Sequence, residues 1–257
     1  MSDFLFRELP NGWTIGRFAS LERLPAIRHL VTTRRALDAD LIRADRPAAA
    51  GALAEAMGLR GVAWLEQVHG DAILDVAADG LACPEHSRGA GKGDGLITDT
   101  PGLGLMCVSA DCPLVLVADL DGRAVGIAHA SWRGTVKQIA LKLARRMVDR
   151  YKLDPSRLVA CICPSAGPQR YEVGADVVEA ALAGIGSEAT AFFRNKDGKT
   201  YFDLWSANRD QLLAAGLREE NVHVAGVCTI TRSDLFPSHR VEGDNAGRFA
   251  AVIAIGR

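Results

Sequence analysis

The chain has 257 residues, of which 48% are hydrophobic and 24% charged, a composition typical of globular proteins. Thirty basic residues against thirty-one acidic ones give a formal net charge of −1, so the charge balance does not favour binding to nucleic acid or to a membrane surface. We therefore expect a small-molecule substrate and no nucleic-acid or membrane partner. We also expect one domain over residues 1–257, acting as a monomer.

The N-terminal segment, MSDFLFRELPNGWTIGRF, lacks the basic region, the apolar run and the cleavage site of a signal peptide. No stretch of the chain is long and apolar enough to span a bilayer. Six cysteines without such a signal predict reduced thiols rather than a disulfide framework. Together these features predict a cytoplasmic protein.

Short apolar runs alternate irregularly with helix-type segments. We predict strands at residues 13–18, 26–32, 62–65, 103–108, 114–118, 124–128, 158–162, 222–227 and 250–255. We predict helices at residues 47–57, 135–151, 175–182 and 204–215, the last with Asp203 as its N-cap and Gly216 just past its end. Because strands come in consecutive pairs as well as alternating with helices, this order predicts mixed α/β (α+β) packing rather than a repeated βαβ fold.

Three segments place a metal-capable side chain at or beside the end of an apolar run: WLEQVHGD with His69, LMCVSADCPLVLVAD with Cys112 and VGIAHASWRG with His129. Two imidazoles and one thiolate suit zinc, and three protein ligands leave the fourth tetrahedral position for water. Zinc lowers the pKa of such a water. These residues are therefore candidate ligands of a catalytic zinc site.

Spacing alone leaves two alternatives open. The two histidines can be hydrogen-bonded core residues with Cys112 as a small buried hydrophobe. Cys112 can instead be a nucleophile with His69 or His129 as its base, although one thiolate does not easily serve as both zinc ligand and nucleophile.

The glycine-rich segment GAGKGDGLITD matches neither of two phosphate-binding patterns. Gly93 follows Lys92 where the Walker pattern needs Ser or Thr, and Asp94 stands where the dinucleotide fingerprint needs its third glycine. The segment is either a loop that delivers Asp94 to the site or a solvent-exposed turn.

Two further segments carry polar residues suited to a substrate. LFPSHRVEGDNAGRFAAVI contains Ser238, His239, Arg240 and Arg248, and Arg133 follows the strand that ends near His129. The planar fork of arginine suits phosphate or carboxylate, but surface charge in a turn is the more common explanation of a segment like the first. No role is assigned to the remaining cysteines and histidines.

Seven motifs occur in an order that resembles one known family. They are QVHGD, GDGLITD, SADCPLVLVAD, AHASWRGT, RYEVG, DLWSANRDQL and FPSHR with GRFAAVI. In this order, from about Trp64 to the C-terminus, the chain resembles the laccase-domain (multicopper polyphenol oxidase-like) family. Its bacterial members are called YfiH-like and are described as purine nucleoside phosphorylases.

The resemblance implies zinc, with copper less favoured, held by His69, Cys112 and His129. It implies an α/β/β/α layered fold with mixed sheets. It also implies phosphorolysis of adenosine, inosine, guanosine and methylthioadenosine and deamination of adenosine, so purine nucleosides and phosphate are the expected partners. We expect catalytic and substrate-binding roles for the remaining candidates, namely Asp94 as acid/base group and Arg133, Ser238, His239, Arg240 and Arg248.

The sequence departs from the family pattern at four places. Ser131 replaces the central glycine of the second histidine motif, and Pro113 follows Cys112 directly. Residues 32–40 replace a Gly-Gly-Val-Ser loop, and Arg170 replaces a cysteine. We expect the metal site to tolerate these changes and the substrate preference to depend on them.

Three other functions stay open at this point. The family also suggests editing of peptidoglycan precursors by amide hydrolysis. Its older label, copper-dependent phenol oxidation, needs several coppers, whereas one site with a single thiolate holds one. A non-catalytic zinc-stabilised binding module is disfavoured because the predicted site keeps an open coordination position.

Overall fold

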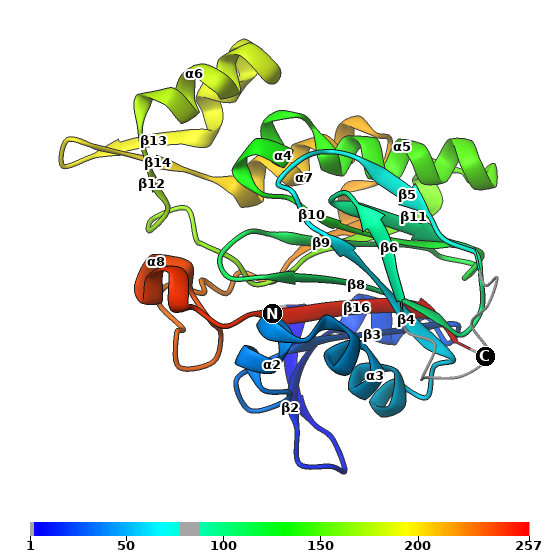
Figure 1. Cartoon of the computed structure of the whole chain (residues 1–257). Helices are drawn as coiled ribbons and strands as arrows, with labels where there is room; N and C mark the ends of the chain where they lie inside the picture. The colour runs from blue at the N-terminus through cyan, green and yellow to red at the C-terminus, as the bar shows by residue number, and fades with distance from the viewer. Residues whose placement is uncertain (1–2, 78–87, 257) are drawn as a thin grey trace.

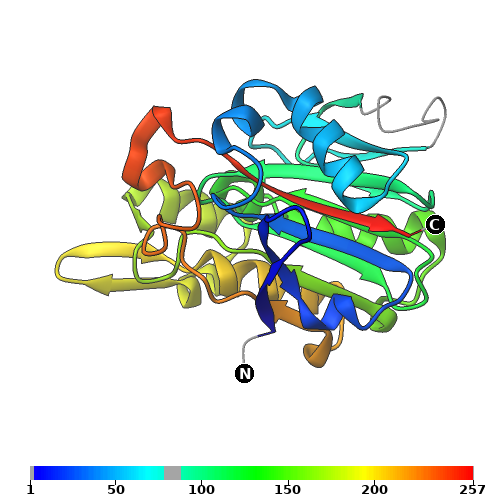
Figure 2. The same cartoon turned by 90° about the horizontal axis from the view of Figure 1, so that it is seen from below.

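The computed structural model describes residues 3–77 and 88–256, which form two stacked sheets with helices on their outer faces (Figure 1). Cys83 and His86, to which the sequence assigned no role, lie outside the described residues. Figure 2 shows the same arrangement from below, with the N-terminal strands on the face nearest the viewer. Among the described residues, no helix is long and apolar enough to cross a membrane.

The first sheet has seven strands in the order β1-β2-β3-β16-β8-β4-β6. Its strand β4 lies parallel to β8 and β6, whereas the other neighbours are antiparallel. The strands are β1 (Phe4–Glu8), β2 (Thr14–Phe18), β3 (Ile27–Thr32), β4 (Gly61–Glu66), β6 (Arg88–Lys92), β8 (Leu103–Ser109) and β16 (Phe249–Ile255).

The second sheet has six strands in the order β15-β11-β9-β10-β7-β5. It is also mixed, because β11 with β15 and β7 with β5 form parallel pairs among antiparallel ones. The strands are β5 (Ile73–Asp75), β7 (Gly95–Thr98), β9 (Leu114–Asp119), β10 (Val125–His129), β11 (Leu158–Ile162) and β15 (Val222–Val224).

A small third sheet projects from one end of the stacked pair (Figure 1). It consists of β12 (Glu172–Val173), β13 (Phe193–Lys196) and β14 (Lys199–Phe202), together with α6 (Ala175–Gly184). The short helix α8 (His239–Glu242) lies at the same end of the molecule in both ribbon views.

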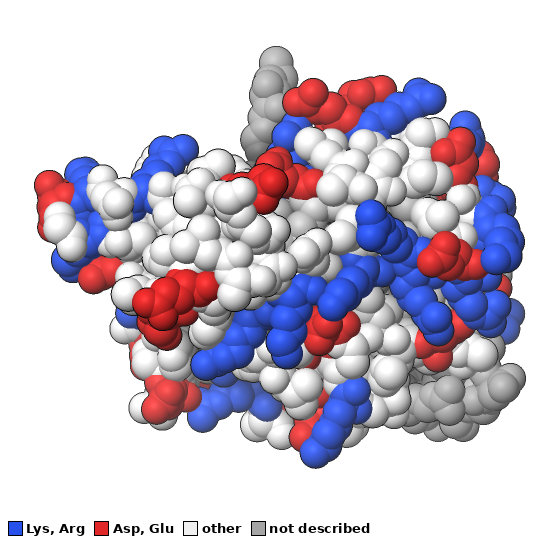
Figure 3. All heavy atoms as spheres, turned by 90° about the horizontal axis from the view of Figure 1, so that it is seen from above, with Lys and Arg blue, Asp and Glu red and all other residues white. Residues whose placement is uncertain are grey.

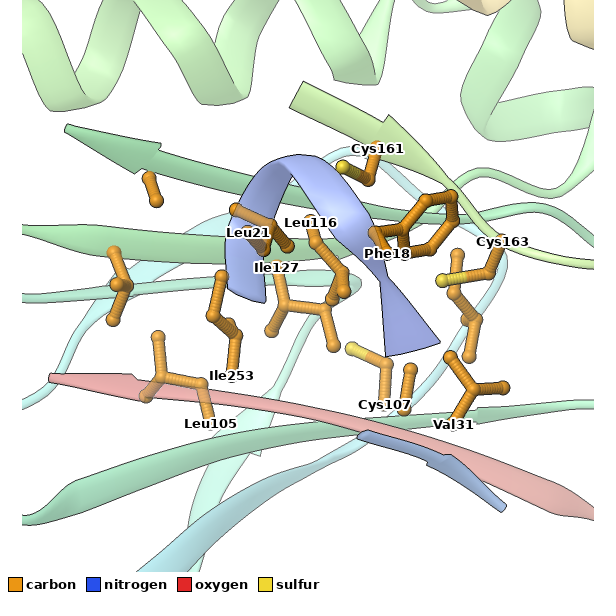
Figure 4. Close-up of a cluster of buried hydrophobic side chains, with 14 of the residues drawn as sticks. Phe18, Leu21, Val31, Leu105, Cys107, Leu116, Ile127, Cys161, Cys163 and Ile253 are labelled. Carbon is orange, nitrogen blue, oxygen red and sulfur yellow. The ribbon is translucent and has the colours of Figure 1, made fainter. Parts of the chain in front are cut away.

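The remaining helices cover the sheets. α2 (Ala39–Ala44) and α3 (Arg46–Met57) lie on the first sheet, whereas α4 (Trp132–Val136), α5 (Ile139–Tyr151) and α7 (Leu204–Ala214) lie over the second. α1 (Ala19–Glu22) follows β2, and its Leu21 enters the space between the sheets (Figure 4).

Three apolar clusters fill the three spaces between the layers. The cluster between the sheets includes Phe18, Leu105 and Leu116 (Figure 4). A second joins the second sheet to α5 and α7, and a third joins the first sheet to α2 and α3. Every residue of β8, β9, β10 and β16 is buried because both faces of these strands are covered. This confirms the expected α/β/β/α layering with mixed sheets.

The helix predicted at residues 135–151 is the one clear correction among the helices. The structure has two helices there, α4 and α5, separated by Lys137 and Gln138, and the φ of Gln138, 62°, is left-handed. The predicted strand at 222–227 ends early, at Val224. The apolar periodicity predicted α5 correctly. The break between the two helices depends on the left-handed backbone of Gln138, which the spacing of apolar residues does not reveal.

The predicted N-cap of α7 is confirmed, and its loss gives a measurable prediction. Asp203 accepts hydrogen bonds from the backbone N–H of Ser206 at 3.0 Å and from its hydroxyl at 2.8 Å. D203A should lower the free energy of unfolding by about 1 kcal/mol and the melting temperature by roughly 2–4 °C. The matched control is D210A on the exposed face of the same helix. Equal melting temperatures for the two variants would contradict the cap.

Candidate metal centre

The three predicted metal ligands come from three separate strand ends. His69 follows β4 with a left-handed φ of 58°, Cys112 lies in the turn between β8 and β9, and His129 is the last residue of β10. Because β10 pairs with β9 so that His129 lies opposite Leu114, His129 is brought next to the Cys112 turn. The ligand atoms of all three residues lie within 4.8 Å of one another, and the two imidazole centroids are 5.0 Å apart.

Asp94 connects two of these ligands. Its buried carboxylate accepts a hydrogen bond from Nδ1 of His129 at 2.8 Å. It also accepts the backbone N–H groups of Val68, His69 and Gly70 at 3.2, 3.1 and 2.6 Å. Because Nδ1 of His129 is bonded to Asp94, the other ring nitrogen, Nε2, can face a metal. The burial of Asp94 excludes the solvent-exposed turn that the sequence left open.

The charge of His129 and the charges of Asp94 and Cys112 stabilise one another. Burial alone would raise the pKa of Cys112, but the positive charge of His129 and hydrogen bonds from both histidines outweigh it and lower that pKa. Burial likewise opposes the charged form of His129, yet the Cys112 thiolate and the Asp94 carboxylate raise its pKa. Hydrogen bonds from His129 and Gly70 overcome burial to keep the pKa of Asp94 below its ordinary value. The site therefore favours the thiolate that a metal ligand must be.

A second buried carboxylate, Asp111, organises the C-terminal segment beside Cys112. It accepts the hydroxyl of Thr229 at 2.6 Å, the hydroxyl of Ser238 at 3.0 Å and the backbone N–H of Arg240 at 2.8 Å. Ser238 is thus buried behind the site, whereas His239 and Arg240 face the cavity.

The three ligands open into a cavity of about 1070 Å³. Of the sequence-predicted residues outside the metal group, Arg133, His239, Arg240 and Arg248 line it, whereas Asp94 and Ser238 do not. The other lining residues are Arg46, Trp64, Leu65, Glu66, Gln67, Val108, Ser109, Ala110, Asp111, Trp132 and Tyr171.

Two of the cavity arginines are held on aromatic rings. The guanidinium of Arg133 lies 4.4 Å from the ring centroid of Trp132, and that of Arg240 lies 4.5 Å from that of Tyr171. Arg240 also donates to the carbonyl of Glu172 at 2.8 Å, which links α8 to the third sheet.

Sequence reasoning missed several of these residues. Asp111 stands directly before Cys112 in the SADC motif, and this neighbouring position was the only sign in the sequence that it has a role. Tyr171 lies in the RYEVG motif, but no site role was assigned to it. Arg46 is brought to the cavity by tertiary packing, and no local pattern around it indicates this.

The departures from the family pattern have local structural consequences. The Ser131 hydroxyl accepts the backbone N–H of Gly134 at 3.1 Å and so caps α4, the helix that carries Arg133. The Pro113 carbonyl accepts the N–H of Ala130 at 2.8 Å, beside His129. In the replaced segment 32–40, Arg34 donates to Glu242 at 2.5 Å and to the carbonyl of Ser233 at 2.9 Å. That segment therefore supports α8 at the cavity rim.

The lowered pKa of Cys112 predicts the pH dependence of its alkylation. Because the thiolate is the reactive form, the iodoacetamide rate of Cys112 in metal-free protein should level off at lower pH than that of a free cysteine peptide, whose pKa is about 8.5. H129A removes the main favourable charge and should shift the profile to higher pH. Peptide mass spectrometry resolves the site, and buried Cys107, whose thiol pKa is raised by burial, is the unreactive control.

A divalent metal ion bound through this thiolate should suppress the reaction. An alkylation rate that zinc leaves unchanged, or a Cys112 profile that matches the free peptide, would contradict this description of the site.

The sequence is similar to those of known proteins. A sequence model of the family described as multi-copper polyphenol oxidoreductase laccase matches residues 40–256. A protein of Xylella fastidiosa named purine nucleoside phosphorylase is 36% identical over 207 residues, covering 79% of this chain and 76% of that protein. Escherichia coli YfiH, also named a purine nucleoside phosphorylase, is 31% identical over 190 residues, covering 74% and 72%.

Solved structures extend the similarity to the whole fold. The crystal structure of YlmD from Geobacillus stearothermophilus has a TM-score of 0.85 at 28% identity and covers 98% of this chain and 99% of that one. Bacillus licheniformis YfiH gives a TM-score of 0.81 at 26% identity, covering 97% and 98%. The chain therefore belongs to the YfiH-type, laccase-domain family.

Proposed function

We propose that this protein is a zinc-dependent purine nucleoside phosphorylase that also deaminates adenosine. The observation that carries the proposal is a His/Cys/His group opening into a large cavity lined by four arginines. Relatives named purine nucleoside phosphorylase support the reaction class. Adenosine, inosine, guanosine and methylthioadenosine are the proposed substrates, with phosphate as co-substrate.

The donor set fits zinc. Ligand atoms in a tetrahedral His/Cys site lie about 3.5 Å from one another, which the cluster's spread of at most 4.8 Å reaches with small side-chain shifts. Three ligands leave one position open, and the cavity gives access to it.

Copper fits less well for two reasons. A blue-copper site adds a weak axial methionine or glutamine, but no methionine lines the cavity in the described part of the chain. Both ends of the Gln67 amide are bonded to the backbone of Val108, at 2.8 and 2.9 Å. Within residues 3–77 and 88–256, His69, Cys112 and His129 also make up the sole metal-capable cluster, whereas oxygen-reducing oxidases need several coppers.

When bound, zinc would supply a Lewis acid that lowers the pKa of a water at the open position. The chain's own residues do the rest. Asp94 is proposed to orient His129, a narrower role than the proton transfer expected from the sequence, because its carboxylate already accepts four hydrogen bonds and lies behind the cavity wall.

The cavity walls suit a nucleoside and an anion together. Trp64, Trp132 and Tyr171 offer flat apolar surface for a purine ring. Arg133, Arg240 and Arg248 are proposed to balance the charge of phosphate and of the transition state. His239 is the remaining polar group placed to contact substrate.

The proposal predicts two product patterns. Zinc-loaded protein should convert adenosine to adenine and ribose 1-phosphate only when phosphate is present, and to inosine with or without it. H129A should reduce both activities by more than about 100-fold, the upper loss expected for a group that merely supports a metal ligand. H223A, on β15 and outside the cavity lining, is the matched control.

Chromatography of the products checks this prediction, and circular dichroism confirms that H129A stays folded. Inactivity on all four nucleosides would refute the proposal. Release of free amino acid from a cytoplasmic muramyl precursor would then favour the amidohydrolase alternative.

The orienting role of Asp94 gives a separate prediction. D94N places an amide N–H₂ beside backbone donors and weakens the hold on His129, so zinc affinity should fall by about 10–100-fold in competition with a chelator. D71N is the matched control, because Asp71 pairs with Lys137 and Lys142 at the surface and does not line the cavity. Equal zinc affinities for D94N and wild type would show that Asp94 does not support the site.

A further inference from the structure

Two arginines from opposite ends of the chain line the same cavity. Arg46 is the first residue of α3, and Arg248 immediately precedes β16. Their elements are joined because α3 packs on the sheet that contains β16, and because the backbone N–H of Arg248 donates to the carbonyl of Ala39 in α2 at 2.8 Å. The pair is therefore fixed by packing of the first sheet rather than by loop position.

Neither guanidinium forms an ion pair with any carboxylate of residues 3–77 and 88–256. Arg248 donates through Nη1 to the carbonyls of Ala246 and Gly247, at 2.5 and 2.9 Å, which holds its side chain but neutralises no charge. Elsewhere basic side chains lie beside acidic ones, as on the face of the molecule seen from above (Figure 3). Lys142 of α5, for example, pairs with Asp71.

Both groups are half-buried and remain charged. Burial and the charge of Arg248 lower the pKa of Arg46 to about 10. Burial and the charge of Arg43 lower the pKa of Arg248. Arg46 is therefore protonated at neutral pH, and the two cations destabilise one another unless an anion lies between them.

The negative charge at the cavity is already engaged, and the Cys112 thiolate belongs to the candidate metal group. The cavity's two lining carboxylates are Glu66, which is exposed and pairs with Lys92 at 3.4 Å, and Asp111, whose oxygens accept three hydrogen bonds. Its other two arginines, Arg133 and Arg240, are held on aromatic rings. Neither of these two has a carboxylate partner among the described residues, but the rings fix their positions, so Arg46 and Arg248 are the two lining cations that are not held on a ring.

We propose that Arg46 and Arg248 form the subsite for inorganic phosphate, with Arg46 as a phosphate-binding residue contributed by the N-terminal half. This inference rests on the proposed phosphorolysis. In that reaction a phosphate oxygen bonds to the ribose anomeric carbon as the bond from that carbon to the purine nitrogen breaks. The electron pair stays with the purine, which takes up the proton that phosphate carried. The two guanidinium forks hold the other phosphate oxygens.

Steady-state kinetics of R46Q with each substrate varied in turn tests the subsite. The KM for phosphate should rise at least about tenfold and the KM for nucleoside less than about twofold, since a charge-assisted bond to phosphate is lost. R46K, which keeps the charge without the fork, should recover part of the loss. R60Q should match wild type, because Arg60 is an exposed arginine just before β4 that does not line the cavity.

An unchanged phosphate KM in R46Q, or an equal rise for both substrates, would overturn the subsite. If R46Q does not fold, the phosphate KM of R46K decides in the same way. Turnover of adenosine 5′-monophosphate in preference to adenosine with phosphate would show that the pair holds a nucleotide and would also overturn it.

Failure of the underlying function is distinguishable from failure of the subsite. If wild type catalyses no phosphorolysis, the proposed function is wrong, and calorimetric titration with inorganic phosphate tests the subsite alone. Binding by wild type that weakens at least tenfold in R46Q supports it. Absent binding, or equal binding by the two proteins, refutes it.

Discussion

The site depends on one buried carboxylate, that of Asp94. Without partners it would be too costly to bury, and here it is stabilised by hydrogen bonds from His129 and from three successive backbone N–H groups around His69. Its own backbone carbonyl accepts the N–H of His129 at 2.7 Å. One residue in the tight connection between β6 and β7 therefore fixes both the left-handed turn after β4 and the end of β10. The metal group can form only if these two segments are held together.

Asp111 plays the corresponding part on the other side of Cys112. It draws in Thr229, Ser238 and the backbone of Arg240, segments distant in sequence, so that α8 and its arginine form the cavity rim. The replaced segment near the N-terminus reinforces this arrangement through Arg34. Glu242 accepts one hydrogen bond from the Arg34 guanidinium and another from the backbone N–H of Ser238. The rim is thus built from three chain segments, and its shape depends on the one that departs most from the family pattern.

The sequence predicted what local patterns encode. β8, β9 and β16 are continuous apolar runs because both their faces are buried, and the Asp203 cap has a recognisable position. Short strands such as β12 to β14 carry no comparable periodicity and were missed. The candidate metal ligands were recognisable through ordered motifs rather than spacing. Arg46 was not recognisable from the sequence, because an arginine at the start of a helix usually lies on the surface. Only the packing of α3 on the first sheet places it at the cavity.

Charge balance connects the metal group to the cavity. A Cys112 thiolate and the Asp94 carboxylate carry two negative charges in buried surroundings, of which a proton on His129 offsets one. A divalent cation would neutralise both, whereas a monovalent copper ion would leave one uncompensated. The cluster would then need no help from the arginines. Their positive charge would remain available for a ligand, so the proposed metal site, which is rich in negative charge, and the proposed anion-binding cavity can share one wall.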